Sequence, residues 1–541
     1  MNELSYCCKN HPNEYEVKYN TVDYFLDRYD EEEGNKECMI FYDSCMRRSS
    51  LTRSQWSNQS LQFAYNLFGK GKKGDVYCLL LPNRPEFAIS FIGLQRLGFN
   101  TLLTPRTEFL RLLLNDFKFK GLVTLSSYWK RFSDNKKAQD LSHIILIEDE
   151  KLDNVTDNVI LYKDLIKECS MKPKLPRVQN DEDLIILTTS GSVGKPKLVQ
   201  VHQKKYLGNI NKALMNSIAG DNVIFSDRPL AYSGGLTLIF GFLSGLQVVM
   251  TDYPCSNQGS FTTKDIATII SKENCSRVVL FAYLICDMVN SPNDFRLIAK
   301  HAKVILTGGQ AICMSTIHHI WEIAPSLPVV EVYASTEMGR AFLKTRTKED
   351  PNPFPVLPAG TEFSIRDENG DILERGEIGE IWVRNKTMMI CYFNDPENTS
   401  KTLNKNGWIK TGDLALMTDD GNIKFQGRLN DVIKIATLKT YPLPFENVMN
   451  NNKCIEICVV LGLPDERLGC HLCLVVKLKK EWIHKETEAH KEIEDYWNEN
   501  FKSDVEGGVV HTLKKIFFIT EWPLTSSTKI LRRKLYDMFK I

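Results

Sequence analysis

Short apolar runs alternate with helical patterns along most of the chain. Residues 76–81 form an unbroken apolar run that predicts a buried strand, and residues 86–97 carry apolar side chains at helical spacing. Further apolar runs predict strands at 122–125, 144–148, 184–188, 278–281 and 304–306. Strands that alternate with helices indicate an α/β fold built of largely parallel sheets.

The pattern changes after residue 351. Residues 363–370 predict a strand that runs into a turn, and residues 380–384 predict another strand. The segment 419–422, Asp-Asp-Gly-Asn, separates two further apolar stretches as the turn of a hairpin would. Beyond residue 428 a short α+β pattern follows. The sequence therefore predicts a strand-rich region and then a separate small α+β unit.

One stretch, 229–251, contains no charged residue and is long enough to cross a bilayer. It also contains Tyr232, several glycines and Gln247, and no basic clusters flank it. We therefore expect a buried core helix with close glycine packing and no transmembrane span.

Composition narrows the class of protein. At roughly 150 residues per domain, 541 residues predict between two and four domains. Apolar residues make up 43% and charged residues 25%, which indicates a globular chain rather than a disordered or collagenous one. The 68 basic and 67 acidic residues leave a net charge of +1. Global charge thus gives no reason to expect nucleic acid or an anionic membrane as partner.

The cysteines and the two termini indicate the cellular compartment. The 15 cysteines are scattered, and Cys7 and Cys8 have no matching Cys/His cluster at zinc-like spacing. The N-terminus lacks the basic and apolar segments of a signal peptide, and the C-terminal 539–541 is not a peroxisomal signal. We expect a cytoplasmic protein with reduced thiols. The oligomeric state is left open.

The segment 187–197, Leu-Thr-Thr-Ser-Gly-Ser-Val-Gly-Lys-Pro-Lys, follows a predicted strand and mixes hydroxyls, glycines and lysines. Glycines allow close backbone approach, hydroxyls and amides donate hydrogen bonds, and lysines supply charge, so the segment suits a polyphosphate. It is not a Walker loop, because Pro196 follows Gly194-Lys195 where Ser or Thr is required. The alternative is a polar surface loop.

This loop resembles the signature Thr-Ser-Gly-(Ser/Thr)-Thr-Gly-x-Pro-Lys-Gly of the acyl-adenylate-forming superfamily, which contains acyl-CoA synthetases, peptide-synthetase adenylation domains and luciferases. Val193 and Leu198 are departures from it. The family's other motifs have counterparts in the same order, from about residue 37 to the C-terminus. They are similar to segments 81–87, 307–311, 332–337, 376–383 with 392–397, 407–414, 427–435, 460–466 and 525–533. The chain is identified as a member, most like an acyl-CoA synthetase.

The resemblance implies a two-step reaction. A small-molecule carboxylic acid attacks the α-phosphorus of ATP to give an acyl-adenylate and pyrophosphate, and the thiol of CoA then displaces AMP. ATP, Mg²⁺ and CoA are the implied cofactors. Negative charge crowds around phosphorus in the first step, so fixed cations and hydrogen-bond donors should supply most of the catalysis.

The motifs assign roles to five residues around the nucleotide. By resemblance, Thr336 contacts phosphate and Glu337 holds Mg²⁺, a hard cation that prefers carboxylate oxygen. Tyr333 packs against adenine, and Asp413 accepts hydrogen bonds from the ribose hydroxyls. Arg428 also reaches the nucleotide. The structural alternatives are a core tyrosine, an ordinary turn aspartate and a linker salt bridge.

Three lysines are matched as well. Lys529 corresponds to the lysine that the small domain inserts against the α-phosphate, although it could belong to a merely basic tail. Lys197 should approach the β- and γ-phosphates, and Lys434 belongs to the loop that serves the thioester step. The remaining nucleotide-binding residues implied by the motifs are Thr189, Ser190, Gly191, Ser192, Gly194, Gly309 and Gln310.

The resemblance also implies the domain organisation. We expect a large AMP-binding domain at 1–427, made of stacked, mostly parallel sheets with helices plus a small β-subdomain. A small mobile α+β domain should follow at 428–541, with a hinge near Asn430. Two reactions need one cleft, and Lys434 and Lys529 lie at opposite ends of the small domain's sequence, so a rigid-body rotation would exchange them.

Five further positions depart from the family pattern. Ala334 replaces a glycine beside the substrate pocket, and Tyr232 stands where many relatives have His. Thr437 and Thr528 replace glycines, and Pro444 replaces a Glu. A β-branched residue tolerates the backbone angles of a glycine position poorly. Because the 434–439 loop serves the thioester step in the family, the resemblance implies that these losses affect that step more than adenylation.

Three functions therefore remain open. The first is an acyl-CoA synthetase, and the second is an adenylating enzyme with another acceptor, such as a carrier protein, or with only the first half-reaction. The third is a non-catalytic nucleotide-binding descendant. The acid pocket is expected at 232–238, 308–312 and 334–340, but the acid itself is not specified by these residues.

Overall fold

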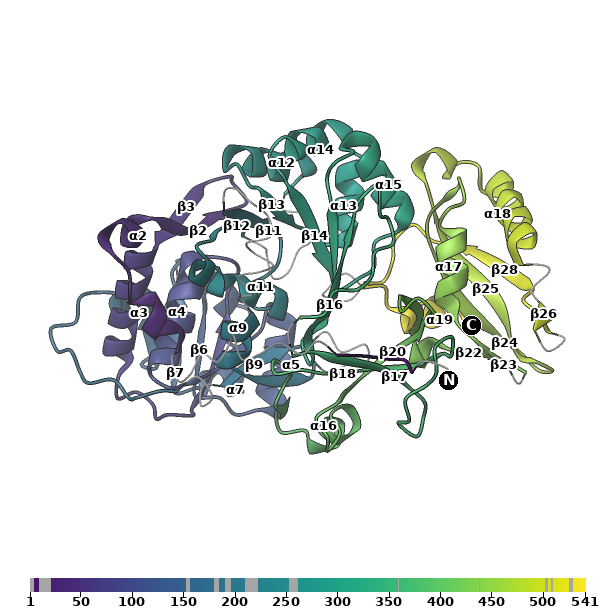
Figure 1. Ribbon diagram of the computed structural model, residues 1–541. Helices are drawn as coiled ribbons and strands as arrows, with labels where there is room; N and C mark the ends of the chain where they lie inside the picture. The colour runs from purple at the N-terminus through teal and green to yellow at the C-terminus, as the bar shows by residue number, and fades with distance from the viewer. Residues whose placement is uncertain are drawn as a thin grey trace.

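The computed structural model describes residues 4–8, 21–151, 156–179, 184–189, 196–209, 222–252, 261–358, 360–436, 438–501, 505–506, 509–524 and 529–541. It has a large N-terminal domain of mostly parallel sheets and helices and a smaller C-terminal domain, coloured yellow-green in Figure 1. The expected α/β fold is confirmed.

The first sheet has eight strands in the order β19-β10-β9-β5-β4-β6-β7-β8. Strands β9, β5, β4, β6, β7 and β8 are parallel to one another, β10 is antiparallel to β9, and β19 is antiparallel to β10. The strands are β4 (Val76–Leu80), β5 (Asn100–Leu103), β6 (Gly121–Leu125), β7 (His143–Ile147), β8 (Val159–Leu161), β9 (Leu184–Thr188), β10 (Leu198–His202) and β19 (Cys391–Tyr392).

Helices accompany this sheet along the chain. The best defined pair is α3 (Arg53–Leu67), which begins at a capping box of Thr52 and Gln55, and α4 (Pro85–Arg96). The two pack closely, because a Cβ at Gly93 would lie 2.4 Å from the Phe63 ring. The other helices are α1 (Val22–Leu26), α2 (Glu31–Asn35), α5 (Thr107–Asp116), α6 (Ser126–Trp129), α7 (Lys136–Gln139), α8 (Tyr162–Leu165) and α9 (Gln203–Asn209).

The second sheet also has eight strands, in the order β16-β15-β14-β13-β11-β12-β2-β3. Its edge strands β3 and β16 are antiparallel to a parallel centre. The strands are β2 (Glu37–Tyr42), β3 (Arg48–Thr52), β11 (Val223–Ser226), β12 (Gln247–Thr251), β13 (Arg277–Val279), β14 (Val304–Gly308), β15 (Val329–Ser335) and β16 (Gly339–Arg346). Its helices are α11 (Ser233–Ile239), α12 (Thr263–Lys272), α13 (Ala282–Val289), α14 (Pro292–Ala299) and α15 (Met314–Ile323).

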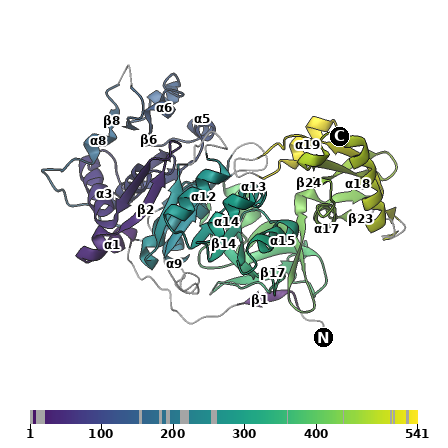
Figure 2. The ribbon, with the colours of Figure 1, turned by 90° about the horizontal axis from the view of Figure 1, so that it is seen from above.

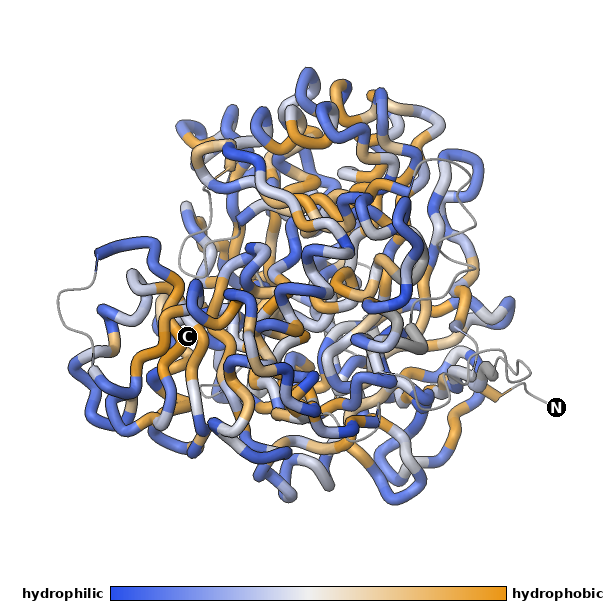
Figure 3. Tube along the Cα trace, turned by 90° about the vertical axis from the view of Figure 1, so that its left-hand side faces the viewer, coloured by the Kyte–Doolittle hydropathy of each residue, from blue (hydrophilic) through white to orange (hydrophobic). Residues whose placement is uncertain are grey.

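Strand β2 shows why these strands are continuous apolar runs. Met39 and Phe41 pack into the core shared with the first sheet, whereas Ile40 and Tyr42 pack into the core beneath α12 to α15. A strand covered on both faces needs apolar residues at every position, since successive side chains point to opposite faces. Figure 3 shows the hydrophobic segments concentrated inside the molecule.

A third, five-stranded antiparallel sheet forms the β-subdomain, in the order β1-β17-β18-β20-β21. Figure 2 shows the N-terminal strand β1 beside β17, although their paired residues are hundreds of positions apart. The predicted hairpin at 419–422 is confirmed, because it joins β20 to the antiparallel β21. The elements are β1 (Tyr6–Cys8), β17 (Glu362–Arg366), β18 (Gly379–Arg384), α16 (Pro396–Thr402), β20 (Ile409–Met417) and β21 (Ile423–Arg428).

The C-terminal domain has its own core, in which α18 buries Ala489, Ile493 and Trp497 against β24 and β25. Strand β28 extends the β24–β25 pair in parallel. The elements are η2 (Leu429–Asp431), β22 (Ile433–Ile435), β23 (Leu438–Thr440), α17 (Pro442–Met449), β24 (Ile455–Asp465), β25 (Gly469–Leu478), η3 (Lys480–Trp482), α18 (Glu486–Phe501), β26 (Val505–Glu506), β27 (Val509–Val510), β28 (Leu513–Phe518) and α19 (Arg532–Phe539).

The uncharged stretch 229–251 is buried as predicted, but the expectation of one helix is wrong. It forms the short helix α11, a 3₁₀ turn η1 (Phe240–Ser244) and strand β12. Gly245 at φ 68° ends the turn, a conformation that favours glycine, so the chain reverses instead of continuing as a helix. In the part of the chain that the structure describes, no helix is long and apolar enough to span a membrane.

Candidate functional site

A large cleft of about 3420 Å³ opens where the second sheet, the β-subdomain and the C-terminal domain meet. Its lining includes the ends of β13, β14 and β15, the start of β16, and residues of β20, β21 and α17. In open parallel sheets, ligands bind beyond the carboxyl ends of the strands. The cleft is therefore where the fold favours a binding site.

Asp413 is held at one wall of this cleft. Its Oδ2 accepts a hydrogen bond of 2.6 Å from the Tyr333 hydroxyl, and its Oδ1 lies 2.9 Å from Nε of Arg428. Arg428 is the cross-strand neighbour of Asp413 between β21 and β20. Burial, and then the nearby Asp413 charge, raises the pKa of Tyr333 well above its ordinary value. Each carboxylate oxygen keeps a further acceptor position, so Asp413 is able to bind a ligand hydroxyl.

Aromatic rings and glycines shape the wall beside Asp413. The Tyr333 ring lies 4.9 Å from Phe342 and 5.0 Å from Phe425. Opposite β15, a Cβ at Gly308 would lie 2.7 Å from the Val332 carbonyl oxygen, so no larger residue fits there. Gly309 has a φ of +86° and faces open space. Tyr333, Gly308 and Gly309 all line the cleft, and the two glycines have no side chain to fill it.

Glu337, the predicted Mg²⁺ ligand, lines the same cleft. Its Oε1 accepts a hydrogen bond of 2.9 Å from the Tyr392 hydroxyl. Nζ of Lys197 lies 4.6 Å above the centre of the same Tyr392 ring. Burial raises the pKa of Tyr392, and the Glu337 charge raises it further, so this hydroxyl stays protonated and donates. Lys197 and Glu337 are therefore linked through one aromatic side chain.

The predicted phosphate loop is described only at its two ends. Thr189 and Lys197 line the cleft, and the Thr189 amide donates a 2.9 Å hydrogen bond to the Lys197 carbonyl. This bond continues the β9–β10 pairing, so the two residues close the base of the loop. The predicted contacts at Ser190, Gly191, Ser192 and Gly194 lie outside the described residues.

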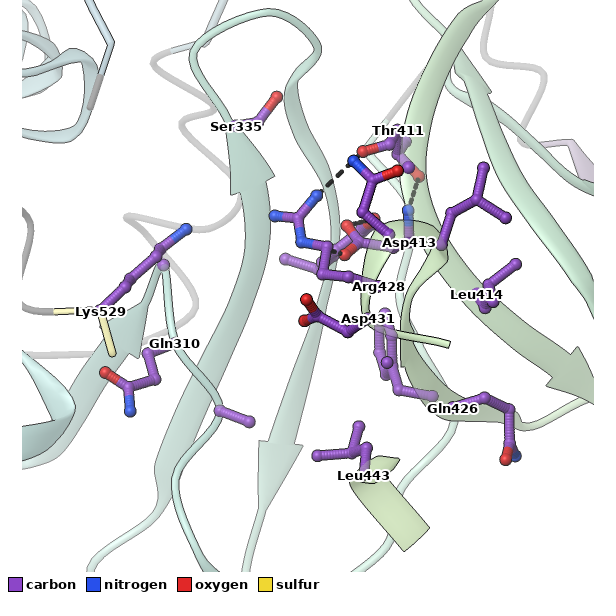
Figure 4. A pocket seen from close by; sticks show the side chains of 18 of the residues that line it. Gln310, Ser335, Thr411, Asp413, Leu414, Gln426, Arg428, Asp431, Leu443 and Lys529 are labelled. Carbon is purple, nitrogen blue, oxygen red and sulfur yellow. Dashed lines mark hydrogen bonds and ion pairs between the residues drawn. The ribbon is translucent and has the colours of Figure 1, made fainter. Parts of the chain in front are cut away.

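Lys529 enters the cleft from the C-terminal domain. Figure 4 shows it across the pocket from Asp413 and Arg428, with Gln310 near it. Burial lowers the pKa of Lys529, and the Arg428 charge lowers it further, whereas Asp413 and Glu337 raise it. The fold thus brings the side chains at 337, 413, 428 and 529 into electrostatic contact.

The segment after Lys529 is anchored by Arg532. This guanidinium donates two hydrogen bonds of 2.7 Å to the carboxylate of Glu446 and lies 3.2 Å from Asp431. Asp431 belongs to the segment predicted as the hinge. Lys434, on β22, also lines the cleft, so both predicted catalytic lysines of the small domain are near it.

Three of the five further departures from the family pattern lie in the described residues, and two do not. Tyr232, Ala334 and Pro444 line the cleft, and Pro444 lies in the first turn of α17, where proline is tolerated. Thr437 and Thr528 lie outside the described residues.

One buried residue at this site escaped the sequence analysis. The Lys205 ammonium donates a 2.6 Å hydrogen bond to the Thr336 carbonyl oxygen, and its residue is only 3% exposed. Burial lowers the pKa of Lys205 to about 7, while the Glu337 charge opposes the shift. The neighbouring Lys204 is exposed, and nothing in the sequence of this Lys-Lys pair distinguishes the buried lysine from the exposed one.

Replacing Lys205 with Met is expected to raise the free energy of unfolding by about 2–4 kcal/mol near pH 6. The folded protein must bury a charged ammonium below a pKa of about 7, whereas the ordinary value is 10.5. Because the folded-state pKa is lower, the stability of the parent protein rises as pH increases from 7 to 10.5. The difference in free energy of unfolding between the variant and the parent therefore becomes smaller over that range. Urea unfolding of both proteins near pH 6 and pH 9 measures this difference.

The exposed Lys204→Met is the matched control and should change stability little at either pH. A Lys205→Met variant that is less stable than the parent near pH 6 would contradict the expectation, because the hydrogen bond to Thr336 would then outweigh desolvation.

Comparison with known proteins agrees with this geometry. Residues 26–393 match the family model described as AMP-binding enzyme. The chain is 24% identical to 4-coumarate–CoA ligase 4 of Arabidopsis thaliana, over 95% of this chain and 90% of that one. It is 24% identical to peroxisomal OPC-8:0-CoA ligase 1 of the same plant, over 87% of this chain and 84% of that one.

Solved structures share the fold. The anthranilate CoA ligase AuaEII in complex with anthranoyl-AMP superposes with a TM-score of 0.79 at 20% identity, covering 96% of this chain and 98% of its own. The amide bond synthetase McbA from Marinactinospora thermotolerans gives a TM-score of 0.78 at 20% identity, covering 96% and 99%.

Proposed function

The chain belongs to the AMP-binding enzyme family, and we propose that it activates a carboxylic acid with ATP and transfers the acyl group to CoA. The observation that carries the proposal is the meeting of Glu337, Asp413, Arg428 and Lys529 in one cleft. The relatives are named as CoA ligases, which supports CoA as the acceptor.

In the proposed nucleotide complex, adenine lies against Tyr333 and the Gly308–Gly309 turn, which all line the cleft. The ribose hydroxyls donate to Asp413, whose orientation is fixed by the Tyr333 hydroxyl and Arg428. The phosphates then extend toward Thr336, Lys197 and Glu337.

In adenylation, the substrate carboxylate attacks the α-phosphorus and pyrophosphate leaves. Lys529 stabilises the negative charge that accumulates on the α-phosphate oxygens, and Lys197 stabilises the departing pyrophosphate. Charge stabilisation by groups already in place is the largest contribution that such a site makes. Burial lowers the pKa of Lys529, whereas the charges of Asp413 and Glu337 raise it.

The site also fits a magnesium ion. Mg²⁺ is usually held in proteins by one or two carboxylates together with substrate phosphates and water, and Glu337 supplies one such carboxylate. Among the described residues no group of three or more His, Cys, Asp or Glu forms an all-protein cage. When bound, the metal would neutralise charge on the β- and γ-phosphates.

In the thioester step the CoA thiol attacks the acyl carbon and AMP leaves. We propose that the unit from about residue 428 rotates about Asn430, withdrawing Lys529 and presenting the Lys434 loop to the thiol. The ion pair between Lys439 and Glu368, 2.8 Å long, connects the small domain to the β-subdomain and would break in this rotation. Because this pair is exposed, its loss costs little.

Pyrophosphate release, assayed with a panel of carboxylic acids with and without CoA, tests the proposal. An acyl-CoA synthetase forms the adenylate and releases pyrophosphate without CoA, but it forms a thioester and turns over repeatedly only when CoA is present. An enzyme with another acceptor releases a single equivalent of pyrophosphate and retains the adenylate. No release with any acid in the presence of ATP and Mg²⁺ would overturn the proposal.

Replacing Asp413 with Ala is expected to weaken ATP binding by about 10- to 100-fold, or about 1.5–3 kcal/mol. The ribose hydroxyls would lose their charged acceptor, and Arg428 would lose its ion pair. Isothermal titration calorimetry with ATP measures the change. Tyr333→Phe, which removes only the hydroxyl that orients Asp413, should cause a smaller loss. Unchanged ATP affinity in Asp413→Ala would refute the ribose assignment.

A further inference from the structure

The turn at 336–338 joins β15 to the antiparallel β16. It carries Thr336, which we assign to phosphate, and Glu337, which we assign to Mg²⁺, and both residues line the cleft. The places of these two side chains depend on the backbone of the turn. Backbone carbonyl groups away from water need hydrogen-bond partners, so the donors that bind these carbonyls determine how the turn is held.

The segment before β19 binds two of the three carbonyl oxygens in this turn. The Met389 amide donates a 2.6 Å hydrogen bond to the Glu337 carbonyl. Nδ2 of Asn385 donates a 2.9 Å hydrogen bond to the Met338 carbonyl. Asn385 is itself held by Thr387, whose amide and hydroxyl each donate to its Oδ1 at 2.8 Å. The second half of the turn is therefore fixed by a segment that follows it in the chain.

Lys205 binds the remaining carbonyl oxygen, that of Thr336, with Nζ 2.6 Å away. The lysine belongs to α9, a helix that precedes the turn by more than a hundred residues. Gln203 and Tyr206, close to it on the same helix, are buried, and Nε2 of Gln203 donates a 2.9 Å hydrogen bond to Gln95. Because α9 is anchored in this way, Lys205 is able to hold the first half of the turn in place.

An ammonium at this position is costly to bury. Lys205 is only 3% exposed, and burial lowers its pKa to about 7 although the Glu337 charge opposes the shift. A methionine would fill similar space without that cost. The hydrogen bond to Thr336 does not require the charge, because the protonated and the neutral amine both carry N–H donors. A buried donor that lowers stability is expected where its hydrogen bond serves an active site.

We propose that Lys205 is a positioning residue for adenylation, because its hydrogen bond to the Thr336 carbonyl holds Thr336 and Glu337 where they bind phosphate and metal. The inference rests on the proposed function. Lys205 acts through the turn and needs no contact with the substrate. The thioester step occurs at the acyl carbon after pyrophosphate has left, so the role of Lys205 belongs to the first half-reaction.

Lys205→Met tests the proposal, because it removes the donor and keeps an unbranched side chain of similar length. Pyrophosphate release in a single turnover is expected to slow by about 10- to 100-fold, the size of effect that a misplacement of about 1 Å causes. Conversion of a chemically supplied acyl-adenylate to the thioester should stay close to the parent rate. Affinity for AMP, measured by calorimetry, should also be unchanged, since Tyr333 and Asp413 hold adenine and ribose.

The selective loss is expected in a variant that is at least as stable as the parent near pH 6. A residue with a merely structural role would not slow one half-reaction while stability is kept. Lys204→Met, which removes the exposed neighbouring charge on α9, is the matched control and should leave both half-reactions near normal.

Asn385→Ala separates positioning from charge. It removes an uncharged donor from the opposite side of the same turn, so it should also slow pyrophosphate release more than thioester formation. Normal pyrophosphate release by Asn385→Ala, together with slow release by Lys205→Met, would attribute the loss to the lysine charge and overturn the positioning role.

Two further results would overturn the inference. Pyrophosphate release by Lys205→Met at the parent rate would refute it and leave the proposed function intact. Equal slowing of both half-reactions, accompanied by lower stability, would assign Lys205 to the fold alone. Failure of the parent protein to release pyrophosphate with any acid would instead refute the proposed function, and the inference with it.

Discussion

Replacing Lys529 with Ala is expected to slow adenylate formation by about 100- to 1,000-fold, comparable to removal of one preorganised charge-stabilising donor elsewhere. Its ammonium shares the cleft with Asp413, Arg428 and Glu337, so alanine would leave the α-phosphate charge without this partner. Pyrophosphate release in a single turnover measures the loss. Thioester formation from a chemically supplied acyl-adenylate should be nearly unaffected, because the proposed rotation withdraws Lys529 before that step.

Two comparison variants sharpen this test. Lys534→Ala removes the same charge from an exposed position on α19 and should leave both half-reactions near normal. Asn430→Pro fixes φ at the proposed hinge and should slow the thioester step far more than adenylation. Equal losses in both half-reactions for Lys529→Ala and Asn430→Pro would rule out the alternating use of the small domain. A loss in Lys534→Ala as large as in Lys529→Ala would indicate a merely basic tail.

Replacing Glu337 with Gln is expected to reduce Mg²⁺-dependent pyrophosphate release by at least about 100-fold. The two side chains have the same shape, and the glutamine oxygen is still able to accept from Tyr392, so the fold is preserved. Only the negative charge that would attract the divalent cation is lost. Release rates measured over a series of Mg²⁺ concentrations should show a large increase in the concentration that gives half-maximal rate.

Tyr392→Phe is the matched comparison for Glu337→Gln. It keeps the carboxylate charge but removes the hydroxyl 2.9 Å from it, so it should change the Mg²⁺ dependence much less. Near-normal release by Glu337→Gln at limiting Mg²⁺ would remove the metal assignment. The same result would leave the ribose and α-phosphate assignments in place, since those depend on Asp413 and Lys529.

The strands of the parallel sheets were predictable because a strand that is buried on both faces is an unbroken run of apolar residues in the sequence. The run at 76–81 became β4, the run at 184–188 became β9, and the run at 304–306 became the first part of β14. The stretch 229–251 was mispredicted for the same reason. Apolar composition showed that it is buried, but burial alone does not distinguish one helix from a helix, a turn and a strand.

The candidate site was predictable where a motif names both residue and spacing. Tyr333, Glu337, Asp413, Arg428 and Lys529 were found in this way, and all five line one cleft. The loop at 190–195 and Thr437 and Thr528 lie outside the described residues, so their roles stay predictions. The domain boundary at 427/428 and the hinge also stay predictions.

By itself, the sequence determined the α/β class, the order of the motifs and the residue types available for nucleotide chemistry. These follow from local periodicity and from short motifs whose residue types indicate their chemistry without knowledge of the tertiary structure. Only the tertiary structure decided which charged side chains lie close to one another and which are buried. Lys205 lies more than a hundred residues before Thr336 and yet donates to its carbonyl, and Arg428 lies opposite Asp413 because β21 pairs with β20. Burial and electrostatic contact depend on distance in space, which single residues do not encode, because they arise only when sheets, helices and the small domain pack together.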